Sequence, residues 1–347
     1  MRARCILAVL VLHAALAATA TAQVPPPPKL VVGDHPSLPG APLYVALAKG
    51  YYREAGLDVG LESVATASDL AVALATNRVQ VIGGALSAGF FNSLSKGLPI
   101  GLLMSRATSP YFHYLMIRPD RKTKFWHPAD LKGHSVAVAA RDAFLLYELV
   151  KILQSGGLSL ADIDLKYIPF GQVETALTGG AVDAALMTSP LQDQLEAKGI
   201  GLKWINADSR IRVQPVLISA WQVNTDWLKQ NESLAQAFVV ATLRGARDYC
   251  NAFHGGPNRG EVARILIKYS DVRDTALLDQ IEWGATDVHG RISEASVMDV
   301  QDTFFKERLV SDRLPFGRIA PAAWVTEIAA RLGPYRPVND DGLPGCR

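Results

Sequence analysis

Most residues that could hold a small molecule occur in turns that follow short apolar segments of the chain. Read in order, the candidate ligand contacts are His35, Ser37, Leu38, Gly40, Ser68, Leu86, Ser87, Tyr114, Arg141, Asp142, Gln172, Thr188 and Ser189. Together they offer hydroxyl, phenol, amide, imidazole, guanidinium and carboxylate groups. This mixture suits the capture of a small polar or zwitterionic organic molecule about as well as it suits an organic acid.

Several of these residues also have a purely structural interpretation. Ser68 and Ser87 are well placed to cap helices, and Asp142 in a first helical turn is stabilised by the helix dipole without any ligand. His35 in a surface turn would ordinarily be exposed. Arg141 could clamp a carboxylate or sulfonate with its planar fork, pair with Asp142, or lie in solvent. The sequence leaves these alternatives open.

Neither a metal site nor a catalytic nucleophile is indicated. The seven His are scattered, and no Cys/His cluster has the spacing of metal ligands. Cys5 lies in an N-terminal apolar run, and Cys250 and Cys346 both lie in the last third of the chain. We therefore expect no cofactor, no metal and no catalysis. An oxidising compartment would allow Cys250 and Cys346 to pair, although the Gly/Pro-rich end of the chain leaves this open.

The N-terminal segment is typical of an export signal. Arg2 and Arg4 precede an apolar run, and Ala20-Thr21-Ala22 predicts cleavage after Ala22, which places the mature protein in the periplasm. Of the 35 basic residues, the two in this segment would be removed, leaving 33 against 33 acidic residues. A net charge of zero argues against a nucleic-acid partner. No later segment suggests a membrane span, and we expect a monomer.

A twofold repeat of strands and helices predicts two lobes built alike. Residues 29–85 alternate short strands with helices, and 135–190 repeat this order about a hundred residues later. Nearly all-apolar strands between helices predict mostly parallel sheets covered on both faces. We expect the following organisation: 1–22 signal, 23–28 Pro-rich linker, 29–117 first part of lobe I, 118–217 inserted lobe II, 218–335 return to lobe I with the C-terminal helices, and 336–347 flexible tail. The two chain crossings would lie near 117–120 and 214–219.

Four segments resemble a known family in order and spacing. "APLYVALAKGYYREAGLDVGLE", "ALATNRVQVIGGALSA", "HPADLKGHSVAV" and "ALTGGAVDAALMTSPLQDQLEAKGIG" are similar to the nitrate/sulfonate/taurine-type substrate-binding proteins of ABC importers. That group also includes binding proteins for the thiamine pyrimidine precursor. The resemblance covers most of residues 29 to 335 and is weakest in the helical C-terminal third.

The resemblance implies a two-lobed α/β fold, the periplasmic binding protein type II fold. It also implies capture of a small organic ligand by hinge closure and delivery to an ABC permease in the inner membrane. One departure affects the ligand class: nitrate and sulfonate binders of the family have small Gly/Ser residues where this chain has Arg141-Asp142. Two alternatives remain: an enzyme on the same fold, desulfinase-like or thiamine-precursor-synthase-like, and a module that passes a ligand signal to a membrane receptor.

Overall fold

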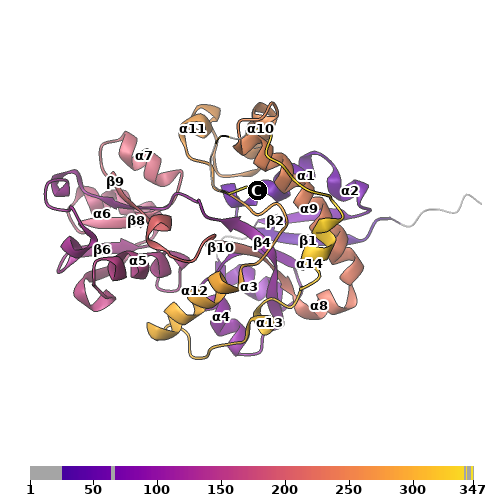
Figure 1. Ribbon diagram of the computed structural model, residues 1–347, viewed down its shortest axis with the longest axis horizontal. Coiled ribbons are helices and arrows are strands. Elements are labelled where there is room, and N and C mark those ends of the chain that lie inside the picture. Colours follow the sequence, from indigo (N-terminus) through magenta and orange to yellow (C-terminus); the bar gives the residue numbers. More distant parts are fainter. Residues whose placement is uncertain (1–25, 64–66, 340, 342–344, 347) are drawn as a thin grey trace, which may run out of the picture.

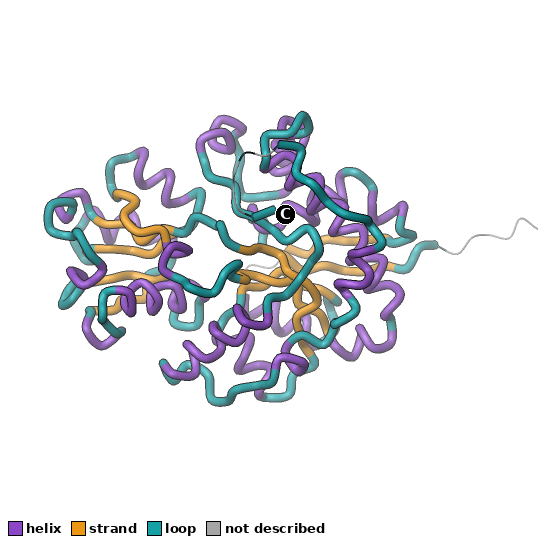
Figure 2. Tube along the Cα trace, in the orientation of Figure 1, coloured by secondary structure: helices purple, strands orange, loops and turns teal. Residues whose placement is uncertain are grey.

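Two mixed α/β lobes lie side by side in the computed structural model (Figures 1 and 2), which describes residues 26–63, 67–339, 341 and 345–346. The expected signal segment, its cleavage site and the start of the Pro-rich linker lie outside these residues. Each lobe contains a five-stranded sheet with helices against its faces. The two-lobed α/β fold predicted from the sequence is thereby confirmed.

The strands are β1 (Lys29–Asp34), β2 (Asp58–Ser63), β3 (Val81–Ala85), β4 (Ile100–Thr108), β5 (Tyr114–Ile117), β6 (Ser135–Val138), β7 (Asp164–Tyr167), β8 (Ala184–Met187), β9 (Leu202–Asn206) and β10 (Leu217–Asn224). The α-helices are α1 (Ala41–Ala48), α2 (Tyr51–Glu54), α3 (Ala67–Ala75), α4 (Ala88–Ser95), α5 (Phe144–Ser155), α6 (Phe170–Thr178), α7 (Leu191–Ala197), α8 (Thr225–Gln230), α9 (Glu232–Phe253), α10 (Arg259–Tyr269), α11 (Thr275–Gln280), α12 (Glu294–Lys306), α13 (Phe316–Ile319) and α14 (Val325–Ala330). Short 3-10 turns are η1 (Leu38–Gly40), η2 (Pro119–Arg121), η3 (Pro128–Leu131), η4 (Leu160–Asp162) and η5 (Ala207–Arg210).

The two sheets have equivalent topologies. The strand order is β2-β1-β3-β10-β4 in lobe I and β7-β6-β8-β5-β9 in lobe II. In each sheet one strand, β10 or β5, is antiparallel to both of its neighbours, and the other strands run parallel to one another. The carboxyl ends of the parallel strands therefore lie at a single edge of each sheet, which is where open α/β sheets bind their ligands.

The chain passes between the lobes twice. The first crossing is 109–113, between β4 and β5, and the second is 207–216, between β9 and β10. The expected position of the first crossing, near 117–120, is corrected, because β5 hydrogen-bonds to β8 and β9 and so belongs to lobe II. The second crossing, expected near 214–219, begins earlier, because β9 ends at Asn206 and β10 begins at Leu217. A short, wholly apolar strand such as β5 fits either lobe equally well, so the hydrophobic pattern alone could not locate the first boundary.

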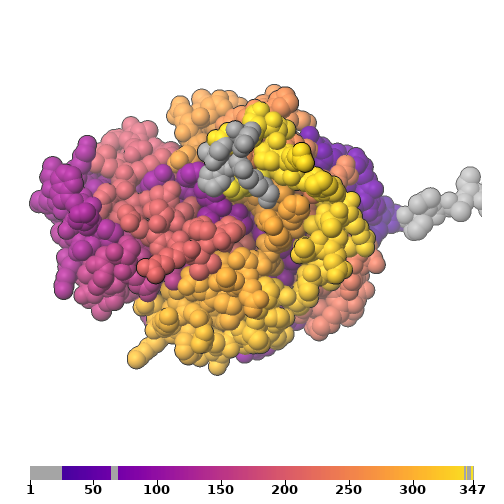
Figure 3. All heavy atoms as spheres, in the orientation of Figure 1, coloured from indigo at the N-terminus to yellow at the C-terminus, as the bar shows by residue number. Residues whose placement is uncertain are grey.

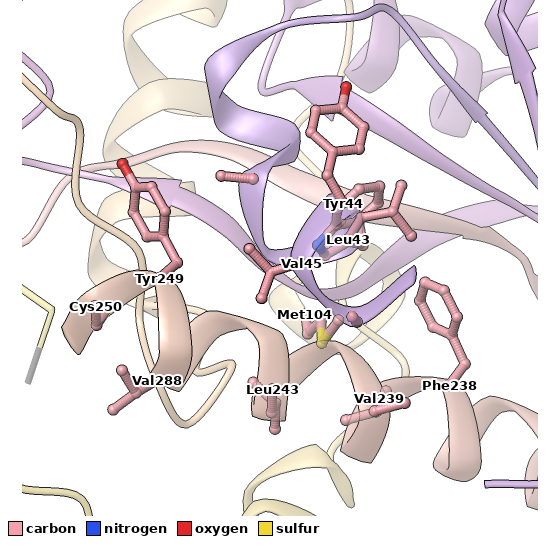
Figure 4. Packing of buried hydrophobic residues seen from close by; sticks show 14 of the residues in the cluster. Leu43, Tyr44, Val45, Met104, Phe238, Val239, Leu243, Tyr249, Cys250 and Val288 are labelled. Atoms are coloured by element: carbon pink, nitrogen blue, oxygen red, sulfur yellow. The ribbon is translucent and has the colours of Figure 1, made fainter. Parts of the chain in front are cut away.

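Packing of α1 on α9 forms the main core of lobe I. Figure 4 shows Val45 on the side of α1 that faces Leu243 of α9, whereas the Tyr44 ring points away from α9, and all three side chains are buried. The helical segment between β1 and β2 is divided into α1 and α2 at Gly50, whose φ of 78° is left-handed. This break turns the chain back along α9 and toward β2.

The end of the chain is covalently attached to this core. Cys250 of α9 and Cys346 form a disulfide that spans 96 residues, which settles the pairing that the sequence left open. Cys346 is only 2% exposed. The sequence predicts a flexible tail, but at Cys346 the tail is packed against the core of lobe I.

Opening this disulfide should weaken the fold substantially. We expect Cys346→Ser to lower the free energy of unfolding by about 3–5 kcal/mol, because a cross-link over a loop of this length restricts the unfolded chain. Urea unfolding with and without a reductant measures the effect. The reductant should destabilise the native protein and leave Cys346→Ser unchanged; equal stability of the two oxidised proteins would contradict the prediction.

Candidate functional site

The carboxyl edges of the two sheets face each other across the seam between the lobes. β1 and β3 end on the lobe I side, and β6 and β8 end on the lobe II side. The turns that follow them meet directly, since the backbone N–H of Ala88 at the start of α4 donates to the carbonyl of Asp142, 3.1 Å away. In Figure 3, lobe II (magenta to red) lies against the gold C-terminal segment of lobe I. The local fold of each sheet thus brings the turns of both lobes to one seam.

A buried ion pair lies on the lobe I side of this seam. Nη2 of Arg106 donates to both carboxylate oxygens of Asp34, at 2.7 and 3.0 Å, and the two side chains are 6% and 5% exposed. Tyr44 donates its hydroxyl to the same carboxylate. Burial together with the Asp34 carboxylate raises the pKa of Tyr44. Arg106 Nη2 also lies 3.3 Å from the Ser37 hydroxyl, so the pair supports the turn that follows β1.

The ion pair depends on space that only glycine leaves. Arg106 extends from β4 across the sheet, and its guanidinium lies 5.1 Å from the Trp221 ring centre on β10. A β-carbon on Gly83 of β3 would collide with both the Asp34 carboxylate and the Arg106 guanidinium. The pair therefore joins β1 to β4 over the intervening strands, and Arg106 Nε is buried without a hydrogen-bond partner in the described chain.

The two crossings are fastened to each other by one carboxylate. Oδ2 of Asp208 accepts the backbone N–H groups of Tyr111 and Phe112, at 2.6 and 3.2 Å. Phe112 has a φ of 60°, which is rare for a bulky residue, and its carbonyl accepts from the Gln192 amide. These contacts fix an unusual backbone conformation at the centre of the seam.

A second buried pair lies beside the first crossing. His113 Nδ1 lies 2.9 and 3.0 Å from the two carboxylate oxygens of Glu148, which has no exposed surface. Burial opposes the charged imidazolium, but the Glu148 carboxylate and more weakly Asp208 raise the pKa of His113. Burial in turn raises the pKa of Glu148 against the effect of His113.

Two pockets open along the seam. One, of about 480 Å³, lies between α4, the turn after β6 and the end of α12, and its charged lining residues are Lys96, Arg141, Asp142 and Arg308. The other, of about 660 Å³, lies at the β4–β9 side and is lined by both crossings together with residues 286–287 and 345–346. The second pocket takes no residue from the turns that follow β1, β3, β6 or β8.

Several predicted site residues lie at the seam. Arg141 and Asp142 are exposed and line the smaller pocket, and neither side chain has a hydrogen bond or ion pair within the described chain. Ser37 is half-buried beside Arg106, and His35 is exposed in the same turn. Tyr114 is half-buried, with Lys203 Nζ 5.2 Å from its ring centre. Their contact with a ligand stays a prediction.

Other predicted contacts have structural roles. Leu38 and Leu86 are buried in two core clusters, so their side chains are closed to a ligand in this structure. Gly40 is buried where a β-carbon would strike the Tyr44 ring. Ser87 caps α4, its hydroxyl accepting from the N–H of Phe90 at 3.1 Å.

Three predicted contacts follow strands of lobe II. Thr188 and Ser189 are half-buried in the turn after β8, and the Ser189 hydroxyl donates to Asp193. Gln172 is exposed within α6. In lobe I, Ser68 lies within α3 rather than before it, and its side chain lies outside the described part of the structure.

The most important residues missing from the predicted ligand contacts are Asp34 and Arg106. Arg106 lies in "IGLLMSRAT", whose nine residues are all buried. A cation within a run of buried, mostly apolar residues requires a partner, and this was the available signal. The signal could not identify the partner, because Asp34 is 72 residues away in sequence.

In the part of the chain that the structure describes, no cluster of three or more His, Cys, Asp or Glu side chains is arranged to hold a metal ion. None of the helices there has both the length and the apolar character needed to cross a membrane.

Comparison with known sequences finds one family and one distant relative. The family model described as NMT1/THI5 like matches residues 40–252. The riboflavin-binding protein RibY of Chloroflexus aurantiacus is 27% identical over 218 residues. This match covers 61% of the present chain and 59% of RibY, so it spans less than two thirds of the relative's length.

Comparison with solved structures finds the same fold in proteins of different activities. The periplasmic aliphatic sulphonate binding protein SsuA of Escherichia coli has a TM-score of 0.68 at 16% identity, covering 84% of this chain and 91% of SsuA. A ligand-binding component of an ABC-type import system from Staphylococcus aureus gives 0.69 at 16%, covering 87% and 99%. The desulfurization enzyme DSZB gives 0.65 at 16%, covering 87% and 99%. At these identities the likeness concerns the fold.

The Asp34–Arg106 pair gives a direct stability test. We expect Arg106→Met to lower the free energy of unfolding by about 3–5 kcal/mol, because it leaves a buried carboxylate unpaired. The double variant Asp34→Leu/Arg106→Met should lose less than the sum of the two single losses. Denaturant unfolding measures all of them.

The matched control for this test is Arg118→Met. Arg118 pairs with exposed Asp120 at 2.9 Å, and an exposed pair of this kind contributes less than about 1 kcal/mol. Equal losses for Arg106→Met and Arg118→Met, or strict additivity of the Asp34 and Arg106 substitutions, would show that the buried pair does not have the assigned role.

Proposed function

The chain belongs to the NMT1/THI5-like family, and from this premise we propose that it is a solute receptor that captures a small organic molecule between its two lobes. The observation that carries the proposal is the arrangement of the seam. Turns after β1 and β3 of lobe I oppose turns after β6 and β8 of lobe II, and only two short crossings connect the lobes.

Capture would proceed by closure of the lobes about these crossings. A molecule that contacts both sets of turns binds the closed arrangement better than the open one and so shifts the population toward it. The crossings are suited to this role because Asp208 of the second accepts two backbone N–H groups of the first, so the two segments can act as one hinge. No bond in the ligand needs to be made or broken.

The lining of the seam favours an organic ligand with a planar or apolar part. Tyr111, Phe112 and Tyr114 are partly exposed in or next to the first crossing, and aromatic rings offer large contact surfaces. Ser37, Thr188 and Ser189 bring hydroxyl groups to the same region. The name of RibY, a riboflavin-binding protein, is compatible with such a ligand, and riboflavin is accordingly the first compound to test.

Delivery of the ligand to an ABC permease follows from the same premise. The S. aureus neighbour is a component of an ABC-type import system, and the SsuA neighbour is periplasmic. The export signal expected over residues 1–22 would bring this chain to the same compartment. We propose that it works there as a monomer that meets an inner-membrane permease.

Binding rather than catalysis is favoured by the state of the cysteines. The fold of DSZB shows that an enzyme can be built on this framework. In the described part of the present chain, both Cys250 and Cys346 are held in a disulfide, and Cys346 borders the β4–β9 pocket as part of that bond. No thiolate therefore serves as a nucleophile at the seam within the described residues.

A thermal-shift screen of the chain from Gln23 onward tests the proposal. The screen contains riboflavin, alkanesulfonates, nitrate, aromatic carboxylates, pyrimidines and amines. One of these classes should stabilise the protein in a saturable manner. A ligand at about 100 times its dissociation constant adds about 2.7 kcal/mol. The compound should be recovered unchanged after incubation; a compound that is consumed would favour an enzyme.

Site variants locate the binding. Thr188→Val removes one hydroxyl from the turn after β8 and should weaken binding about tenfold, by the loss of one hydrogen bond. Thr178→Val, a matched change at an exposed position of α6, should leave the affinity unchanged. The proposed site is contradicted if the ligand binds Thr188→Val, Thr178→Val and the unaltered protein with the same affinity, because the Thr188 hydroxyl then makes no contact with it.

A further inference from the structure

We propose that the pocket between α4 and the turn after β6 binds a doubly charged anionic group of the captured molecule, such as a phosphate monoester. The statement that this group is part of the captured molecule rests on the proposed function. The anion site itself is argued from the residues of the pocket, which neither the family nor the structural neighbours assign.

The charges that line the pocket are unbalanced. Lys96, Arg141 and Arg308 contribute three cations, and Asp142 contributes the one carboxylate. None of the four side chains has a hydrogen bond or ion pair within the described residues, although other surface cations such as Arg118 and Arg313 are paired. A formal charge of +2 in a pocket of about 480 Å³ is matched by a dianion better than by a monoanion.

The start of α4 adds a neutral donor to the same pocket. The first N–H groups of a helix have no partners within the helix. Here the N–H of Ala88 is used by the Asp142 carbonyl, and the N–H of Phe90 by the Ser87 hydroxyl. Gly89 lies between them and lines the pocket, and Oδ2 of Asp142 lies only 3.1 Å from where a β-carbon on Gly89 would be. The Asp142 carboxylate therefore competes with a bound anion at this helix end, which is why removing its charge should matter. An anion at this position would also benefit from the positive end of the helix dipole.

The conformation of Arg308 is a further indication. It follows the end of α12 with a φ of 57°, a left-handed conformation that glycine normally supplies at this position of a helix. An arginine there costs conformational energy that glycine would avoid. The strain is repaid if the guanidinium serves the pocket, where a planar fork can hold two oxygens of one phosphate group.

The pocket is built from both lobes, so its occupant would act on their arrangement. Lys96 and Arg308 belong to lobe I and its C-terminal return, and Arg141 belongs to lobe II. Without an anion these cations repel each other as the lobes approach. A dianion would convert this repulsion into attraction and favour the closed form. The charge that attracts the ligand thus also opposes closure of the empty protein.

Titration calorimetry with sodium sulfate and sodium phosphate at pH 7.5 and low ionic strength tests the inference. Both anions should bind saturably with one site, and nitrate should bind at least about tenfold more weakly. Arg141→Gln and Arg308→Gln should each weaken sulfate binding about tenfold. Asp142→Asn should have the opposite effect and tighten it, because it removes the only carboxylate of the pocket.

The control is Arg318→Gln, which removes the same charge from an exposed position outside the pocket. The inference is overturned if Arg141→Gln and Arg318→Gln have equal effects, if Asp142→Asn does not tighten binding, or if sulfate and nitrate bind alike. If sulfate binding follows the expected pattern while no organic compound stabilises the protein, the anion site is supported and only the proposed function is contradicted. An organic ligand whose affinity ignores all three pocket variants would contradict only the anion site.

Discussion

The rest of the structure depends on the way two chain crossings are held together between the lobes. Each sheet has one strand that runs against its neighbours, and these two strands, β5 and β10, are those that follow the crossings. Because the direction is reversed there, the carboxyl ends of all the other strands point at the opposite lobe. The Asp208 carboxylate, bound by two backbone N–H groups of the first crossing, fixes the register of this junction. Without that junction the loops of the two lobes would not share a site.

Two buried charged pairs lie near this junction. An Asp–Arg pair inside a lobe contributes little net stability compared with apolar residues of the same size. Asp34 and Arg106 nevertheless join the last residue of β1 to the end of β4 and support Ser37 in the turn between β1 and α1. His113 and Glu148 similarly join the first crossing to α5. Both pairs set the positions of loops rather than the stability of the cores.

The sequence predicted the repeated architecture well because that information is local. Hydrophobic periodicity and turn residues decide each strand and helix within about ten residues, and the repeat then gives two lobes. Long-range features were not predictable in the same way. β5 is a short, wholly apolar strand that could join either sheet, so the first crossing was misplaced. Leu38 and Leu86 follow strands as ligand contacts do, yet their side chains turn into the cores. The partners of Arg106 and Cys346 lie 72 and 96 residues away.

The turn after β6 shows how a single local change alters the whole seam. Small residues there would leave the α4 side of the seam with Lys96 and Arg308 and no charged group from lobe II. Arg141 and Asp142 place both signs of charge on lobe II, directly where the Asp142 carbonyl already contacts α4. The backbone contact brings the lobes together at this point without using either side chain. Neither charged side chain makes a hydrogen bond or ion pair within the described residues, so the charges of this turn can change without altering the contact that joins the lobes.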